Sequence, residues 1–324
     1  MSETGSTVFT RGWASSDSSL NAAFYRSLVC VRSARRVRLR ARLLLTGAFK
    51  MKSPSLHVFF ALTLAAAFLC GADASAFDEY NVWPGPAPGD KEDSAKPTYE
   101  YWRPEKKTSD SLIIVCPGGA YVSLAYGHEG EKIARYFNSK GITAVVLKYR
   151  VPLRLGQPKH MIAWQDAQRC VRVCRSRAEE WGVDPNKIGI MGFSAGGHLA
   201  LLIAASSQTN AYEPVDDIDK LPCNVNFAVP VYPAWVLKTW DSSSFAKEFA
   251  FDEATPPMCL VHGDADFCTP IASAAVYKKL REMNIPAELH IYAKVKHGFG
   301  GSPTDGHIGD WLNRVYAWMN VMGF

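Results

Sequence analysis

The sequence predicts an α/β protein with a mostly parallel central sheet and helices on both faces. Two observations carry this prediction. Strand-length apolar runs alternate along the chain with segments of helical periodicity. Several of the runs are continuously apolar, as expected for strands that are covered on both faces. Alternation of strand and helix is typical of parallel sheets, because each helical connection returns the chain to begin a strand in the same direction.

The expected elements follow one another in a regular order. Strands are expected at residues 111–117, 142–149, 187–192, 226–232, 258–263 and 287–292. Helices are expected at residues 129–141, 161–182, 195–206, 270–284 and 308–322. Gly141 and Gly182 stand where glycines end helices, and Trp311, Val315 and Trp318 recur on one face of the last helix. Residues 81–97 are rich in Pro and Gly and predict an extended arm on the surface.

Composition and charge limit the classes of function. The 324 residues are 48% hydrophobic, enough for a real core, and residues 77–324 suit one large domain. Residues 1–76 hold ten Lys/Arg and three Asp/Glu, so the totals of 36 and 31 leave 26 basic and 28 acidic residues in the remainder. That remainder is near neutral, and no nucleic-acid partner is expected.

Residues 51–76 have the layout of a secretory signal. Met51 and Lys52 precede an apolar stretch at 58–69, and small residues follow up to Ala76. We expect cleavage after Ala76, with the bond after Ala74 as the alternative, and a secreted or periplasmic protein. The apolar stretch is short for a membrane span, so none is expected in the mature protein.

Residues 1–50 are rich in Arg and Ser and poor in acidic residues. This composition fits either an organelle transit segment or an over-extended start upstream of Met51, and we favour the second interpretation. N-terminal sequencing of the natural protein separates these alternatives, and it tests the cleavage site as well.

Six cysteines follow the signal: Cys116, Cys170, Cys174, Cys223, Cys259 and Cys268. An exported protein could pair them. However, two of them lie in apolar runs and two share a helix face, so we expect most of them to be small buried hydrophobic residues. No spacing resembles a zinc site, and no metal is expected.

The stretch Gly192–Gly196 reads G-x-S-x-G between an expected strand and an expected helix. Gly192 and Gly196 carry no Cβ, which lets the chain turn sharply and present Ser194 at strained dihedral angles. The N–H of Ala195 would face the developing negative charge at the start of the helix. The alternative is an ordinary tight turn in which Ser194 caps the helix.

The loops after three other strands supply the remaining groups. Gly119 and Ala120 follow the strand at 111–117, and their N–H groups are expected to complete an oxyanion hole with Ala195. After the strand at 258–263 we favour Asp266 as the catalytic acid over Asp264, because Asp266 lies deeper in the loop.

His297 follows the last expected strand and is expected to be the general base. His307 is its rival. Two other histidines are assigned structural roles: His198 is expected to pack within its helix, and His262 is expected to bond locally at a strand end.

The order Ser194, Asp266, His297 is that of the α/β-hydrolases. Residues 111–300 resemble this superfamily, specifically the small esterases grouped with acetyl-xylan esterases and bacterial feruloyl-esterase-like, hormone-sensitive-lipase-like proteins. The segments "VCPGGAYVSLA", "GFSAGGHLA", "LVHGDADFCTP" and "KHGFG" carry the resemblance. It implies an α/β-hydrolase fold, and a serine esterase without cofactor that deacylates (acetyl or feruloyl) polysaccharide such as xylan. The short segment between the strands at 226–232 and 258–263 implies no large lid.

Ala120 departs from the pattern, because many relatives have a third glycine there. Glycosidase chemistry is not expected, because no pair of strand-end carboxylates could flank a sugar bond. An amidase, formamidase or peptidase on the same fold and a catalytically dead binding protein stay open as alternatives. The natural acyl group and the oligomeric state also stay open. Four aromatic residues could line an acyl pocket or simply pack: Trp235, Trp240, Phe245 and Phe249.

Overall fold

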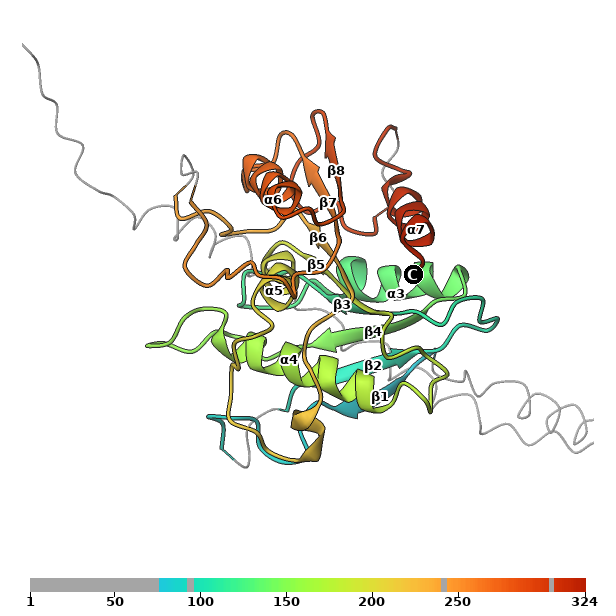
Figure 1. Ribbon diagram of the computed structural model, residues 1–324, viewed down its shortest axis with the longest axis vertical. Coiled ribbons are helices and arrows are strands. Elements are labelled where there is room, and N and C mark those ends of the chain that lie inside the picture. The colour runs from blue at the N-terminus through green and yellow to red at the C-terminus, as the bar shows by residue number, and fades with distance from the viewer. Residues whose placement is uncertain (1–75, 92–95, 240–243, 303–305) are drawn as a thin grey trace, which may run out of the picture. The chain divides into compact units, whose positions relative to one another are not determined.

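A twisted sheet forms the centre of the part of the chain that the structure, a computed structural model, describes: residues 76–91, 96–239, 244–302 and 306–324 (Figure 1). The predicted signal at residues 51–76, apart from Ala76, and the segment before it lie outside these residues. The sheet has eight strands in the order β1-β2-β4-β3-β5-β6-β7-β8. They are β1 (Asp78–Asn81), β2 (Thr98–Trp102), β3 (Leu112–Cys116), β4 (Thr143–Lys148), β5 (Ile188–Phe193), β6 (Phe227–Val231), β7 (Met258–Gly263) and β8 (Ala287–Tyr292).

The six strands β3 to β8 are parallel to one another, and β1 and β2 join the sheet through antiparallel pairs, β1 with β2 and β2 with β4. All six predicted strands are therefore confirmed. Their register places the carboxyl ends of neighbouring strands side by side: Cys116 lies opposite Gly192, and Gly263 lies opposite Tyr292. The loops that follow β3, β5, β7 and β8 consequently all leave the sheet at the carboxyl ends of the strands, where ligands of such sheets bind.

Helices cover both faces of the sheet, as the sequence predicts (Figure 1). α4 (Met161–Ser176), α5 (Ala195–Ala205) and α6 (Ile271–Glu282) share one apolar core with the sheet. α3 (Lys132–Ser139) and α7 (Trp311–Met322) pack in a second core on the opposite face. Two short turns of helix complete the set, η1 (Gly127–Glu131) and η2 (Asp217–Lys220). Gly141 has φ of 78° and directly follows the C-cap of α3, as a helix-terminal glycine requires. α4 ends earlier than predicted, at Ser176, and Gly182, with φ of 63°, lies in the turn that follows it.

The prediction of a surface arm at residues 81–97 is confirmed only in part, because Pro84 and Gly89 are exposed while other residues of the segment are buried in the core. Val82 and Trp83 are 1% and 2% exposed, and the segment connects the two antiparallel strands that the sequence did not predict. The indole Nε1 of Trp83 donates a hydrogen bond of 2.8 Å to Asp166 on α4. Asp166 also accepts from the backbone N–H and the Nε of Arg150, at 2.8 Å and 3.0 Å. These buried bonds tie the segment to the core.

The cysteines behave as small buried residues. Cys116, Cys170, Cys174, Cys223, Cys259 and Cys268 are all buried and free. Burial raises the pKa of Cys268 to about 12, so its thiol is neutral and unreactive at neutral pH. This confirms the hydrophobic interpretation.

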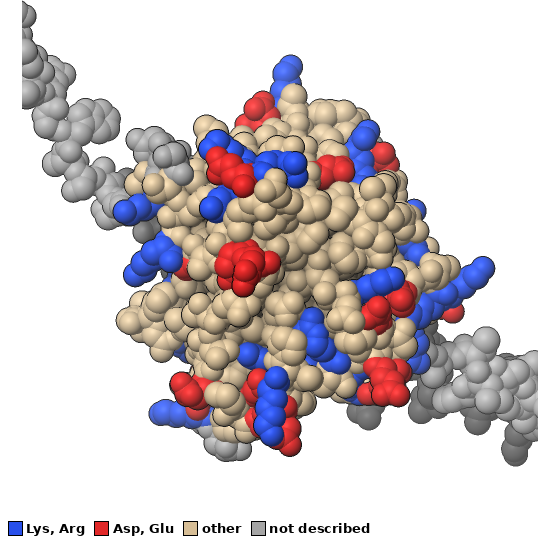
Figure 2. All heavy atoms as spheres, viewed as in Figure 1, with Lys and Arg blue, Asp and Glu red and all other residues tan. Residues whose placement is uncertain are grey.

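The surface carries charges of both signs in mixed order, with no one-signed field on the face that Figure 2 shows. Among the helices of the described residues, none combines the length and the apolar character that a bilayer crossing requires.

We predict that Trp83→Phe destabilises the fold by more than Trp318→Phe does. Both changes remove part of a buried indole ring, but only the first removes a hydrogen bond from buried Asp166. The difference in the free energy of unfolding should be about 1–3 kcal/mol, measured by urea denaturation. Equal losses in the two variants would show that the bond contributes nothing.

Candidate active site

Ser194 lies on the turn between β5 and α5 with φ of 53° and ψ of −114°. These are dihedral angles that a non-glycine residue adopts only under strain, which the surrounding structure must stabilise. A Cβ on Gly192 would collide with the carbonyl oxygen of Gly196, and a Cβ on Gly196 would collide with that of Cys116. Glycine at both positions therefore permits the close approach of strand, turn and helix, as the sequence predicts.

The side chains of Ser194, His297 and Asp266 form a continuous chain of hydrogen bonds. The Nε2 atom of His297 lies 2.8 Å from the Ser194 hydroxyl oxygen, and its Nδ1 atom lies 2.8 Å and 2.9 Å from the two carboxylate oxygens of Asp266. Because an ionised carboxylate only accepts, Nδ1 carries the ring proton and Nε2 accepts from the serine hydroxyl. This arrangement is the one that general-base activation of a serine requires.

Asp266 is fixed by its own loop. Its side chain is fully buried, and the N–H of Cys268 donates to it at 2.7 Å. Asp264 is exposed at the start of the same loop, and among the described residues no contact joins its carboxylate to His297. The structure therefore brings Asp266, and not Asp264, to the imidazole.

The other histidines have local partners. His262 bonds the hydroxyl of Ser273 at 2.8 Å and the carbonyl of Cys268 at 2.6 Å, and burial lowers its pKa, so it stays neutral. His307 is exposed and donates to the carbonyl of Ala293 at 3.0 Å. Neither ring contacts Ser194. His198 is fully buried, but it does more than pack, because both of its ring nitrogens have polar partners.

The loop after β3 passes beside the serine. A Cβ on Gly118 would lie 3.0 Å from the Cβ of Ser194. Gly119, Ala120 and Tyr121 follow with φ of 129°, 55° and 58°. The N–H groups of Gly119, Ala120 and Ala195 make no hydrogen bond within the described part of the chain, so they are available as donors. Their role as an oxyanion hole stays a prediction.

Ala120 holds a left-handed conformation that glycine adopts at no cost. An L-residue there costs roughly 1–2 kcal/mol. Alanine in place of the expected glycine is thus accommodated at the cost of backbone strain.

Glu129 and Tyr232 are two residues of the site that the sequence did not reveal. Glu129, in η1, is 3% exposed and accepts from the N–H of Gly118 and from the hydroxyl of Tyr232, both at 2.7 Å. The hydroxyl oxygen of Tyr232 accepts from the N–H of Gly300 at 3.0 Å, and its ring centroid lies 4.8 Å from that of His297. Burial, and next the charge of Glu129, raises the pKa of Tyr232 well above its usual value. This network connects the glycine loop to the histidine loop.

The aromatic residues suggested for an acyl pocket have different environments. Trp235 is 39% exposed and stacks on Tyr121 at 5.8 Å. Phe249 is buried against the ring of His198 at 5.1 Å, and Phe245 packs on Phe251 at 4.9 Å. Trp240 lies outside the described residues. Trp235 is therefore the one of the three described that presents a ring to solvent beside the glycine loop.

Two family profiles and several known sequences match parts of this chain. The profile of the BD-FAE family matches residues 100–250, and that of the prolyl oligopeptidase family matches residues 227–322. The chain is 28% identical over 255 residues to an acetylxylan esterase of Xylanibacter ruminicola, covering 69% of this chain and 50% of that protein. It is 27% identical over 227 residues to endo-1,4-beta-xylanase B of Butyrivibrio fibrisolvens, covering 65% and 35%. The chain thus spans half or less of the length of these two relatives.

Solved structures share the architecture. An acetyl ester-xyloside bifunctional hydrolase from Caldicellulosiruptor lactoaceticus matches with a TM-score of 0.66 and 28% identity, over 76% of this chain and 97% of that one. An esterase from Thermogutta terrifontis, Est2, bound to propionate, matches with a TM-score of 0.65 and 22% identity, over 78% and 96%.

A mostly parallel sheet with a strained serine at the carboxyl ends of its strands is the arrangement of the α/β-hydrolase fold. The chain has this fold and is related to acetylxylan esterase, which confirms the resemblance and the fold class expected from the motifs.

We predict that Asp266→Asn lowers kcat by about 10³–10⁴-fold, because an amide neither fixes the imidazole tautomer nor stabilises the imidazolium. Asp264→Asn is the matched control two residues away and should change kcat by less than about tenfold. Both are measured with p-nitrophenyl acetate. A larger loss at 264 would contradict the assignment of the acid.

We predict that Glu129→Gln lowers kcat by about 10–100-fold with little change in KM, because its amide nitrogen would face a donor at Gly118 or Tyr232 and displace the glycine loop. Glu131→Gln, an exposed position two residues on that pairs with Arg135, should match the wild type. Equal activity of Glu129→Gln and Glu131→Gln would show that the glycine loop is held without Glu129.

Proposed function

We propose that this protein is a carboxylic ester hydrolase that acts through an acyl-enzyme formed on Ser194. The observation that carries the proposal is the hydrogen-bonded chain from the Ser194 hydroxyl through His297 to buried Asp266. The esterases among the related sequences and structures support it as well.

The mechanism follows from the positions of these groups. His297 Nε2 takes the proton of Ser194, and the serine oxygen attacks the ester carbonyl, while Asp266 stabilises the imidazolium. The N–H groups of Gly119, Ala120 and Ala195 receive the oxyanion. His297 then returns the proton to the leaving alcohol. In the second half of the reaction His297 activates a water molecule, which hydrolyses the acyl-enzyme and restores the serine.

We propose an acyl group on a polysaccharide, acetyl or feruloyl on xylan, as the substrate. This rests on the similarity to an acetylxylan esterase and to a protein called an acetyl ester-xyloside hydrolase. Export by the segment at 51–76 would bring the enzyme to such a substrate. No metal or organic cofactor takes part in the proposed steps.

Peptide or amide hydrolysis is the second candidate, because the prolyl oligopeptidase profile matches residues 227–322, which include Asp266 and His297. The nucleophile lies outside this match. The same side chains serve ester and amide bonds, so only substrate preference distinguishes the two candidates.

We predict that Ser194→Ala lowers turnover of p-nitrophenyl acetate by roughly 10⁴-fold or more and abolishes labelling by a fluorophosphonate probe, because among the described residues Ser194 carries the hydroxyl that His297 Nε2 bonds. The wild-type protein should label at Ser194 and release acetate or ferulate from acylated xylan faster than it cleaves aryl-formamides or short peptides. Failure of the wild-type protein to label would favour a binding protein with a dead site. Faster amide cleavage would favour the second candidate.

A further inference from the structure

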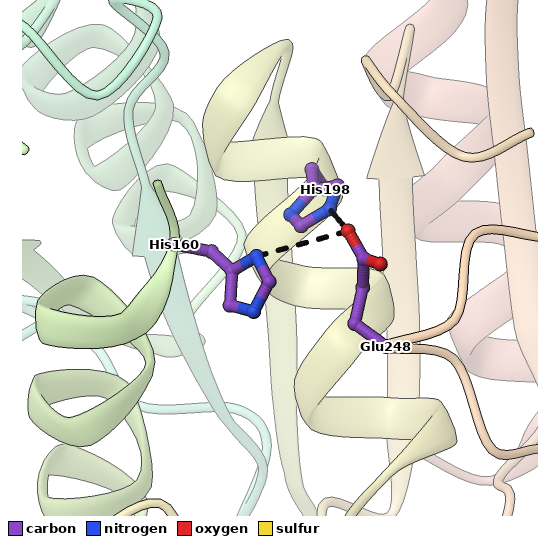
Figure 3. Close-up of side chains that lie close together, drawn as sticks. All are labelled: His160, His198 and Glu248. Atoms are coloured by element: carbon purple, nitrogen blue, oxygen red, sulfur yellow. Dashed lines mark hydrogen bonds and ion pairs between the residues drawn. The ribbon is translucent and has the colours of Figure 1, made fainter. Parts of the chain in front are cut away.

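A second group of polar side chains meets at the first turns of α5, the helix that follows Ser194. His160 directly precedes α4, His198 is in the first turns of α5, and Glu248 is in the connection between β6 and β7. Figure 3 shows both imidazole rings turned toward the carboxylate of Glu248. The Glu248 Oε1 atom lies 3.3 Å from His198 Nε2 and 3.7 Å from His160 Nδ1.

One atom of this group lacks a partner. The Nδ1 atom of His160 is buried without any hydrogen bond, and the side chain is only 8% exposed. Its distance of 3.7 Å to the carboxylate is too long for a hydrogen bond. A buried polar atom without a partner is costly and rare, and here it is directed at two potential ligands.

The spacing suits a transition metal. Ligand atoms about 2.0–2.2 Å from a tetrahedral ion lie roughly 3.4 Å from one another. The two distances to Glu248 are close to this value, and all three ligand atoms lie within 4.8 Å of one another. Closing around an ion therefore requires side-chain shifts on the order of 1 Å.

His198 already has a hydrogen-bond partner at its other ring nitrogen, as a metal-bound imidazole requires. The other ring nitrogen of His198, Nδ1, lies 2.9 Å from the hydroxyl of buried Tyr121. Metal-binding imidazoles almost always donate their second N–H to such an oxygen, which fixes the ring orientation. An ion on Nε2 would leave the ring proton on Nδ1, where the Tyr121 oxygen accepts it.

The residue types also fit, because two imidazoles and one carboxylate form a known ligand set for a metal ion. The charges of Lys159 and Lys247 act on His160, and they reduce the affinity for a cation.

We propose that His160, His198 and Glu248 form a site for a divalent transition-metal ion, with Zn²⁺ the best match to two imidazoles and one carboxylate. The site is separate from the hydrolytic serine and takes no part in the proposed ester chemistry. Tyr121, the hydrogen-bond partner of His198, directly follows Ala120, so a bound ion would stiffen the loop that carries the expected oxyanion donors.

The test measures metal binding directly and does not use ester turnover. The full chain, without a histidine tag and stripped with chelator, is titrated with Zn²⁺ by calorimetry and with Co²⁺ by visible absorption. We expect saturable binding to this site, with the intense absorption of tetrahedral cobalt. His160→Gln and Glu248→Gln should each weaken Zn²⁺ binding by about tenfold or more. They should also abolish the rise in Tm that Zn²⁺ gives the wild type.

His290→Gln is the matched control, because His290, Glu288 and Cys259 form another close group of potential ligands at the sheet edge. It should leave the affinity unchanged. The proposal is overturned if the wild type does not bind Zn²⁺, or if binding falls in His290→Gln but not in His160→Gln. Should His160→Gln fail to fold, Glu248→Gln, whose side chain is 14% exposed, decides in its place.

Discussion

The structure of the site depends on the close approach of β3, β5 and α5 at glycine positions. A Cβ at Gly192 would collide with the carbonyl of Gly196, and a Cβ at Gly196 would collide with the carbonyl of Cys116. This contact fixes the angle at which α5 leaves the sheet, and it forces Ser194 into its strained conformation. The strain is stable because Ser194 is also held by its backbone: its N–H donates to Val231 on β6 at 3.1 Å.

A nucleophile on a rigid turn still needs its partners on separate loops to stay in place. The network of Glu129 and Tyr232 serves this need by connecting the loop at Gly118 to the loop at Gly300 through one buried carboxylate. The two loops are far apart in sequence and have no strand in common. Their relative position is fixed by these side-chain hydrogen bonds together with a backbone bond from the N–H of Gly301 to the carbonyl of His128 at 2.7 Å. In a low-dielectric interior such bonds are both strong and specific in geometry.

Local signals account for what the sequence could predict. Several of the six parallel strands are recognised by continuous apolar runs, and the glycines, Ser194 and His297 by their place after strands. The arm at residues 81–97 was misjudged in part because Pro and Gly indicate irregular backbone, buried or not, and the partner of Trp83 is Asp166, 83 residues away. Glu129 was missed for a similar reason. An acid in a helical pattern predicts a solvated face, and only the fold shows that Gly118 and Tyr232 surround it.

The helix α5 relates the ester site to the second group of ligands. The N–H of His198 donates to the carbonyl of Ser194 at 2.9 Å, so one turn of helix fixes the backbone of both residues together. Tyr121 then bonds His198 from the loop that carries Gly119 and Ala120. Any ion that orients the His198 ring thereby acts on two parts of the hydrolytic site at once: the start of α5 and the glycine loop. Its effect would be on the rigidity of these donors and not on the chemical step, because the proton passes between Ser194 and His297, which do not bind the ion.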